Sequence, residues 1–288
     1  MKKIYILGSL NTDLVIETNV FPNEGETVAG NNFKTAFGGK GLNQAIAARK
    51  LGADVSFLGA IGKDSFGKNL VSLLNEWNID TKHVKTVDDC ASGTAVIILH
   101  NSNNRIVLDL GANLRINKED IDSFLAEAKP GDIFVAQLEN NLDATKYALF
   151  AAKQKGLITV LNPAPANVEI ADALKYVDYF VPNETEYELL KNALNEQVNL
   201  IITKGKHGYS YISKQLEFSG EAPKVKVVDT VGAGDCFVGA LAYVLATGKT
   251  LNKENLDFVC KVASISTTKT GSSSSSPTLE EVNNFIFE

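Results

Sequence analysis

The stretch VKVVDTVGAGDCFVGA, residues 225–240, sets the expectation for the fold and for the chemistry. The apolar run Val225–Val228 predicts a strand, and a glycine turn at Gly232–Gly234 then leads directly into an apolar helix. Such a turn leaves the first N–H groups of the helix unpaired and directed at one point, where an anion can bind. Asp235 lies at that point and would repel the anion, unless it takes a proton from a hydroxyl while the amides hold a transferring phosphoryl group. This combination is typical of a kinase active site.

Further apolar runs extend this unit into an α/β fold. Buried parallel strands are predicted at Ile4–Leu7, Val55–Leu58, Ile133–Val135, Thr159–Leu161, Tyr179–Val181 and Leu200–Thr203. Helical patterns lie between them, at Asn43–Leu51, Gly67–Trp77, Ala144–Lys155 and Thr185–Asn192. The alternation predicts a three-layer α/β/α fold with a mostly parallel central sheet, which binds ligands beyond the carboxyl ends of its strands.

Two segments, residues 14–37 and 93–110, interrupt this alternation. The second is predicted to be a hairpin whose strands are joined by Asn101-Ser102-Asn103-Asn104. We expect the two segments to form a small antiparallel β lid over the site. The large domain would then comprise residues 1–13, 38–92 and 111–288. The alternative is that both segments extend the main sheet.

The bulk composition is ordinary for a soluble globular protein. The 288 residues are 44% hydrophobic and 22% charged. The net charge of −6 argues against nucleic acid or an anionic membrane surface as the main partner. Cys90, Cys236 and Cys260 form no even set and no CxxC pair, which favours a reducing cytoplasm. The first apolar run ends at Gly8, too short for a signal peptide, and no stretch approaches the length of a membrane span, so a cytoplasmic location is expected.

Two polar motifs at predicted strand ends or hinges suit a sugar. Asn11 and Asp13 follow the first strand and could pair with vicinal hydroxyls, although turn chemistry alone also explains them. The turn at residues 38–43 combines glycines that permit close backbone approach with the cation Lys40 and the amide Asn43. The alternative there is a plain turn before a helix.

Three other segments suit a nucleotide or a cation. Asn183 and Glu186 could reach magnesium waters and phosphates, or Glu186 could simply favour the dipole of its helix. The turn at residues 203–208 carries two lysines suited to phosphates and ribose, or it is a solvated hairpin turn. The serine run Ser272–Ser276 normally indicates a flexible loop.

Taken together, these motifs resemble the ribokinase-like carbohydrate kinases, the PfkB family, and the match runs nearly end to end. It is carried by residues 8–13, 37–45, 62–65, 111–113, 137–139, 161–166, 183–186 and 229–235, and by Phe21-Pro22 with residues 25–28. The resemblance implies ATP-dependent phosphorylation of a sugar primary hydroxyl, with D-ribose favoured and D-ribose 5-phosphate as product. The alternatives are a kinase for fructose, a deoxysugar or an adenosine-like nucleoside, and a non-catalytic sugar sensor on the same fold.

The resemblance also implies roles for individual residues. Asp235 would be the general base, beside an anion hole formed by the backbone of Gly232, Ala233, Gly234 and Asp235. The sugar would be bound by Asn11, Asp13, Gly39, Lys40, Gly41, Asn43, Glu139 and Asp235. The ATP site would comprise Asn183, Glu186, Thr203, Lys204, Gly205, Lys206, Gly208, Gly234 and Cys260, with Glu186 near Mg²⁺.

A monovalent cation and a partner subunit are implied in the same way. The K⁺ ligands would come from Asp229, Val231, Ser266, Lys269, Gly271 and Ser275, which would give the serine run a role. A homodimer through the lids is implied, and uncovered lid strands would independently favour pairing. The stretch 187–202 is shorter than in typical relatives, and Cys260 stands where many present a polar adenine contact. Both departures bear on nucleotide preference.

Overall fold

The computed structural model describes residues 1–101, 103–195 and 197–287, and a nine-stranded sheet forms its centre. The strands, in spatial order, are β13 (Glu217–Gly220), β12 (Tyr209–Ile212), β11 (Asn199–Thr203), β10 (Tyr179–Phe180), β9 (Ile158–Leu161), β8 (Ile133–Ala136), β1 (Ile4–Leu7), β4 (Val55–Gly62) and β5 (Asp80–Val87). The pairs from β11 to β5 are parallel, and only β12 and β13 are antiparallel. The predicted mostly parallel sheet is confirmed.

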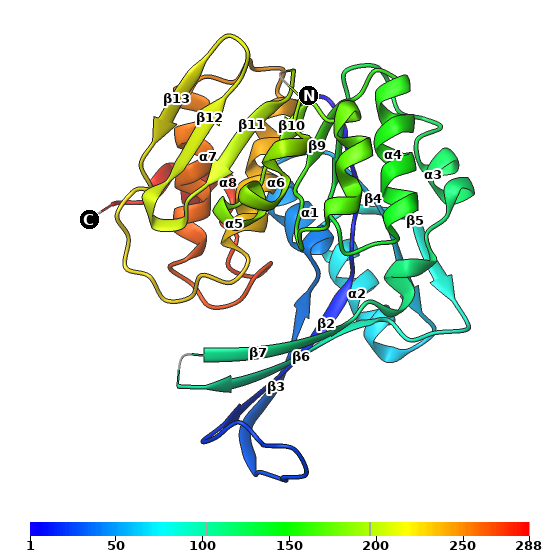
Figure 1. The fold of residues 1–288 in the computed structure, drawn as a ribbon, viewed down its shortest axis with the longest axis vertical. Helices are drawn as coiled ribbons and strands as arrows, with labels where there is room; N and C mark the ends of the chain where they lie inside the picture. Colours follow the sequence, from blue (N-terminus) through cyan, green and yellow to red (C-terminus); the bar gives the residue numbers. More distant parts are fainter. Residues whose placement is uncertain (102, 196, 288) are drawn as a thin grey trace.

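Helices cover both faces of the sheet, so the molecule has the predicted three layers (Figure 1). One face carries α1 (Lys40–Lys50), α2 (Ser65–Glu76), α6 (Ala233–Ala246), α7 (Lys253–Ser266) and α8 (Leu279–Asn284). The other carries α3 (Lys118–Phe124), α4 (Leu142–Gln154), α5 (Glu184–Leu190) and the 3₁₀ segments Gly111–Arg115 and Val168–Tyr176. Alternate side chains of a strand pack in the hydrophobic cores on opposite faces of the sheet. In β1, Ile4 and Ile6 belong to the core on the first face, and Tyr5 and Leu7 to the core on the other.

The strand order reverses at β1, and this fixes where a site can form. From β1 the chain continues outward through β4 and β5, and it later returns to the other side of β1 with β8 and the strands that follow. The carboxyl ends of β1 and β8 therefore lie side by side at a topological switch point, where open α/β sheets bind ligands. Residues 8–11 and 137–139 leave the sheet there.

A second sheet projects from the body of the molecule (Figure 1). Its order is β3 (Gly30–Gly38), β2 (Asn11–Thr18), β6 (Gly93–His100) and β7 (Asn103–Asp109), so the two interrupting segments do not extend the main sheet. Each hairpin is antiparallel as predicted, whereas β2 and β6 pair in parallel. Of the expected hairpin loop, residue 102 lies outside the described residues, and Asn103 and Asn104 already belong to β7.

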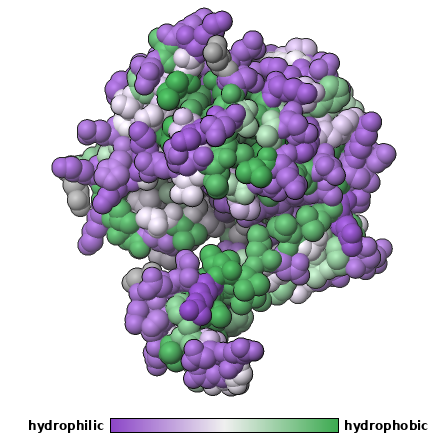
Figure 2. Space-filling view, viewed as in Figure 1, coloured by the Kyte–Doolittle hydropathy of each residue, from purple (hydrophilic) through white to green (hydrophobic). Residues whose placement is uncertain are grey.

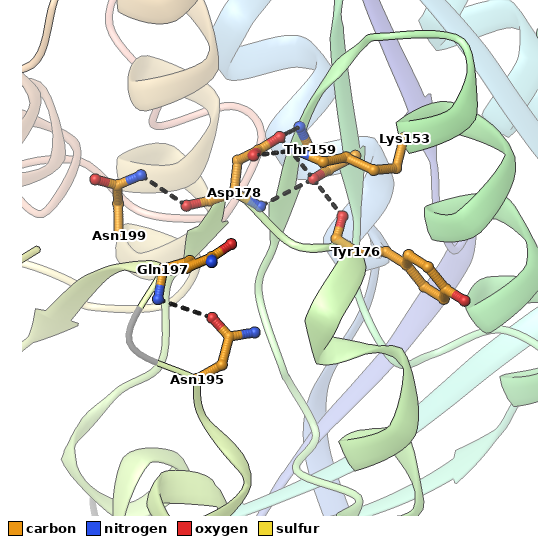
Figure 3. A network of polar contacts seen from close by, with 7 residues as sticks. All are labelled: Lys153, Thr159, Tyr176, Asp178, Asn195, Gln197 and Asn199. Carbon is orange, nitrogen blue, oxygen red and sulfur yellow. Dashed lines mark hydrogen bonds and ion pairs between the residues drawn. The ribbon is translucent and has the colours of Figure 1, made fainter. Parts of the chain in front are cut away.

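A polar network ties together the amino ends of β9, β10 and β11, opposite the switch-point edge (Figure 3). Asp178 accepts hydrogen bonds from the backbone and hydroxyl of Thr159, at 3.0 and 3.1 Å, and forms an ion pair with Lys153. Its carbonyl accepts from Nδ2 of Asn199 at 2.9 Å. These contacts hold the three strands in register from their amino ends. They therefore leave the carboxyl ends, where the site lies, available to ligands.

The predicted strand Val225–Val228 is wrong. This segment has no regular structure, and Val227 and Val228 are more than half exposed. The backbone amides of Val228 and Asp229 instead both donate to the carbonyl of Thr267, at 2.8 and 3.1 Å. Val225 and Val227 line a cavity rather than a core, so an apolar run here does not mean a buried strand.

Within the described ranges, the structure contains no helix that combines the length and the apolar character needed to span a membrane.

Candidate active site

The glycine turn before α6 forms as predicted. Gly232 adopts the left-handed conformation with φ of 77°, and α6 begins at Ala233. In the described part of the chain, nothing accepts a hydrogen bond from the amides of Gly232, Gly234 or Asp235. The amide of Ala233 differs from the expectation, because it donates to the carbonyl of Thr230 at 3.3 Å. The turn therefore presents three free N–H groups to an anion rather than four.

Asp235 is almost buried beside these amides, with 7% of its surface exposed. Two consecutive amides of α1 hold its carboxylate: Nδ2 of Asn43 donates to Oδ2 at 2.9 Å, and Nε2 of Gln44 donates to Oδ1 at 3.0 Å. A carboxylate held in this way keeps a free lone pair on each oxygen and can accept a proton. Sequence reasoning found Asn43 but gave no role to Gln44.

Glu139 forms hydrogen bonds with two of the predicted sugar-binding residues at the switch point. Its Oε2 accepts from Oγ of Ser9 at 2.5 Å, from the backbone of Lys40 at 3.2 Å and from Nδ2 of Asn11 at 3.5 Å. Asn113 fixes the amide of Asn11, because Nδ2 of Asn113 donates to Oδ1 of Asn11 at 2.8 Å. Ser9 and Asn113 are supporting residues without a predicted role.

The glycines at the start of α1 serve close packing. A Cβ on Gly41 would lie 2.4 Å from Cα of Gly8, so the backbone of α1 touches the end of β1. Gly39 lies at the N-cap of α1, against the carbonyl of Ser9. Both glycines bring Lys40 and Asn43 to the switch point, as predicted for a turn that permits close approach.

Charged groups in the site shift one another's proton affinity. Burial, with a contribution from Glu139, raises the pKa of Asp13 from 3.8 to about 6. Burial lowers the pKa of Lys40, but the carboxylates of Asp235, Glu139 and Glu186 outweigh burial and raise it overall. Burial also raises the pKa of Glu186. Lys40 is therefore a fixed cation among carboxylates.

The raised pKa of Asp13 predicts a pH-dependent stability. The folded state holds this proton more tightly than the unfolded state, so the favourable contribution is complete below about pH 4 and is lost as the pH rises through about 6. Asp13→Asn should therefore raise the melting temperature of the free protein at pH 8, and the gain should be clearly smaller at pH 5, since it disappears only below about pH 4. Thermal unfolding of both proteins across this range is the measurement. An equal gain at both pH values would contradict the buried-charge explanation.

Two adjoining cavities contain all the predicted nucleotide-binding residues. The larger, of about 870 Å³, is lined by Asn183, Thr203, Lys204, Gly205, Lys206, Gly208, Gly234 and Cys260, together with apolar residues that include Val225, Val227 and Phe237. The smaller, of about 150 Å³, is lined by residues that include Lys40, Glu186, Gly232 and Asp235. Asn183, Thr203 and Gly234 line both. The cavities therefore meet at the glycine turn, with Asp235 in the smaller one.

Asn183 and Glu186 cap a helix and also lie at the smaller cavity. They form a reciprocal cap on α5, in which each backbone amide donates to the other's side chain at 2.8 Å. They also line the smaller cavity with Lys40. Between α5 and β11 the described residues contain only the short turn Lys191–Ala193, and residue 196 lies outside them.

The residues predicted for a monovalent cation lie around Asp229. Its Oδ1 accepts from the amide of Val231 and its Oδ2 from the amide of Gly271, both at 3.0 Å, so one carboxylate joins the two segments. The hydroxyls of Ser266 and Ser275 donate to carbonyls of their own turns. The ammonium of Lys269 pairs with Glu281, so only its backbone is available to a cation.

The serine run is a buried turn, and the flexible-loop alternative is wrong. Ser272, Ser273, Ser275 and Ser276 are all less than a tenth exposed. Nζ of Lys50, at the end of α1, donates to the carbonyls of Ser273, Ser274 and Ser276, at 3.2, 3.1 and 2.8 Å. The turn packs against Gly232 and thus supports the glycine turn from behind.

The model of the pfkB family of carbohydrate kinases matches residues 1–279. The chain belongs to this family. It is 37% identical to a ribokinase of Schizosaccharomyces pombe, over 98% of this chain and 97% of that protein. It is 36% identical to a deoxyribokinase of Salmonella typhimurium, over 98% of both chains. The structure of Arabidopsis thaliana ribokinase complexed with ribose and ATP superposes with a TM-score of 0.89, at 26% identity and over 99% of both chains.

Burial makes the two cysteines near the site of this kinase unreactive. Cys236 is 1% exposed, and burial raises the pKa of its thiol to about 11, so it is not a reactive thiol. Burial likewise raises the pKa of Cys260 to about 11. Cys260 therefore contributes a neutral thiol to the wall of the larger cavity of this carbohydrate kinase.

Proposed function

We propose that this carbohydrate kinase transfers the γ-phosphoryl group of ATP to the primary hydroxyl of D-ribose, giving D-ribose 5-phosphate. The observation that carries the proposal is the position of Asp235, 7% exposed and held by two amides beside the free N–H groups of the glycine turn. Carboxylate and anion-binding amides serve one reaction when the carboxylate accepts a proton and the amides hold the transferring group.

The proposed reaction has one bond-forming and one bond-breaking step at phosphorus. Asp235 takes the proton of the sugar hydroxyl as its oxygen bonds to the γ-phosphorus, and the bond from phosphorus to the bridging oxygen breaks to release ADP. The amides of Gly232, Gly234 and Asp235, with the ammonium of Lys40, stabilise charge on the transferring oxygens. Mg²⁺ bound with the nucleotide would neutralise phosphate charge, and Asn183 and Glu186 line the side of the smaller cavity suited to it.

D-ribose is proposed because the site is rich in groups that pair with hydroxyls. Asn11, Asp13, Asn43 and Glu139 converge on the switch point, and the buried Oδ1 of Asn43 has no partner among the described residues. The relatives include a deoxyribokinase as well as ribokinases, so 2-deoxy-D-ribose is the second candidate. A site built to bind each hydroxyl discriminates strongly against an analogue that lacks one.

The experiment that tests the proposal measures ADP release with a panel of acceptors. D-ribose should give the highest kcat/KM, ahead of 2-deoxy-D-ribose, D-fructose and adenosine. If another acceptor gives the highest kcat/KM, the assignment as a kinase stands but the proposed substrate is wrong. ADP release with none of them would support the sugar-sensor alternative instead.

Potassium is proposed as an activator near the glycine turn. The carboxylate of Asp229 joins the segments of Val231 and Gly271, whose backbone carbonyls would supply the oxygen ligands that a hard cation needs. Replacing K⁺ by tetramethylammonium should slow turnover, because that cation is too bulky for such a site. An unchanged rate in assays at equal ionic strength would rule out the potassium site.

The projecting sheet is proposed to act as a lid and as the interface of a homodimer. Asp13 lies within β2, and Oγ of Ser272 donates to the carbonyl of Phe37 in β3 at 3.2 Å, so the sheet is joined directly to the site. Closure would exclude water, which otherwise competes for the phosphoryl group. Figure 2 shows apolar side chains on this projecting part, and Val107 and its cross-strand partner Val96 are 69% and 40% exposed. A second copy of the same sheet would cover them and pair its open edges.

Val107→Lys is therefore expected to dissociate the dimer. A charge on a covered apolar surface is strongly unfavourable, so sedimentation velocity should show a shift from dimer to monomer. Val168→Lys is the matched control, since Val168 is 60% exposed on the body of the molecule. A monomeric wild-type protein, or a dimer that survives Val107→Lys, would refute the interface.

The proposed location is the cytoplasm. Cys90, Cys236 and Cys260 are all free thiols, as a reducing compartment requires.

A further inference from the structure

Two fully buried glutamines lie behind Asp235. Gln44 is on α1, next to Asn43, and Gln137 follows β8 at the switch point. Both side chains are 0% exposed. Polar groups buried this completely usually have hydrogen-bond partners, and the partners indicate what a residue does. Every polar atom of the Gln44 side chain has a partner, whereas Oε1 of Gln137 has none among the described residues.

The amide of Gln44 is fully engaged by protein. Its Nε2 donates to Oδ1 of Asp235 at 3.0 Å and to Oδ1 of Asn162 at 3.2 Å, which uses both of its hydrogens. Its Oε1 accepts from Nε2 of Gln137 at 2.7 Å. Asn43 differs, because its Oδ1 has no partner among the described residues and is available to a substrate. Gln44 therefore holds Asp235 without contacting the substrate.

The orientation of the Gln44 amide is fixed from both sides. Nδ2 of Asn162 donates to the carbonyl of Val181 at 2.9 Å, which leaves its Oδ1 directed at Gln44. Gln137 presents a donor to the opposite end of the same amide. A flipped Gln44 would place nitrogen against the nitrogen of Gln137 and oxygen against the carboxylate of Asp235. Both contacts would be repulsive.

We infer that Gln44 is a positioning residue that fixes the carboxylate of Asp235 for proton transfer, and that Gln137 acts through Gln44. The inference rests on the proposed role of Asp235 as base. The amide of Gln44 is neutral, so it orients the carboxylate through a hydrogen bond without forming an ion pair with it. With Asn43 on the other oxygen, the carboxylate cannot rotate, and alignment of this kind is worth about 10²-fold in rate for a displacement of about 1 Å.

The first test replaces Gln44 by methionine, which keeps the length of the side chain and removes its donors. Gln44→Met should lower turnover about 10- to 100-fold, the range expected for losing a hydrogen bond to a charged group. Its affinity for D-ribose, measured calorimetrically without ATP, should match that of the wild type. In an Asp235→Asn background the same substitution should cause no further loss, because the group it positions is no longer a base.

The outcomes separate this inference from the proposed function. An equal loss from Gln44→Met in both backgrounds, or no loss in the wild type, would overturn the inference. If Asp235→Asn alone leaves turnover intact, the assignment of the base fails instead. Gln137→Met is the second variant if Gln44→Met does not fold. It should lower turnover less, and only while Asp235 is present, and an equal loss in both backgrounds would again overturn the inference.

Discussion

Asp235→Asn is expected to lower turnover by at least about 100-fold, the range associated with loss of a general base. Asparagine has nearly the same shape, but its single oxygen can accept from only one of the amides of Asn43 and Gln44, and it cannot accept the proton of the sugar hydroxyl. Binding of D-ribose should largely survive, since Asn11, Lys40 and Glu139 are unchanged. Steady-state kinetics and calorimetry give the two quantities separately.

Asp143→Asn is the matched control for this substitution. Asp143 is an exposed aspartate in the first turn of α4, and it neither lines the described cavities nor contacts Asp235. Its replacement should leave turnover unchanged. Near-normal turnover in Asp235→Asn would remove Asp235 from the role of base.

Gly232→Ala is expected to disable the anion-binding turn. Gly232 has φ of 77°, and a Cβ there would lie 2.7 Å from Cα of Ser272, whose turn Lys50 holds in place. The backbone must therefore move, which displaces the free amides from the transferring phosphoryl group. Loss of one such donor costs roughly 10²- to 10³-fold in turnover, so a loss of at least this size is expected.

Gly248→Ala separates this effect from ordinary backbone strain. Gly248 has φ of 79°, but nothing lies within 4 Å of the position of its Cβ. Both variants should lose stability from the left-handed conformation, on the order of 1 kcal/mol. Only Gly232→Ala should lose turnover. Equal turnover in the two variants would contradict the role of the turn.

The main sheet was predictable because its strands are short apolar runs between helical patterns. Periodicity does not distinguish apolar residues that face a core from those that line a cavity, which is why the prediction failed at Val225–Val228. The serine run misled for a related reason. Its composition indicates flexibility, but the ammonium of Lys50, more than two hundred residues away in the chain, holds its carbonyls.

Only those site residues that belong to recognisable motifs could be assigned a role from the sequence. Strand order explains why Asn11 meets Glu139, since β1 and β8 are neighbours. The supporting residues Ser9, Gln44 and Asn113 lie within recognisable motifs. Their roles could not be predicted, because their hydrogen-bond partners are distant in sequence. The parallel pairing of β2 with β6 was missed because each hairpin alone is antiparallel.

The position of the phosphoryl group on the product is the decisive observation. Phosphorus NMR of the product formed from ATP and D-ribose should show one phosphomonoester signal split into a triplet by the two protons of a primary carbon. A doublet, which reports phosphate on a carbon with one proton, or inorganic phosphate without any sugar phosphate, would contradict transfer to the hydroxyl that Asp235 is proposed to deprotonate.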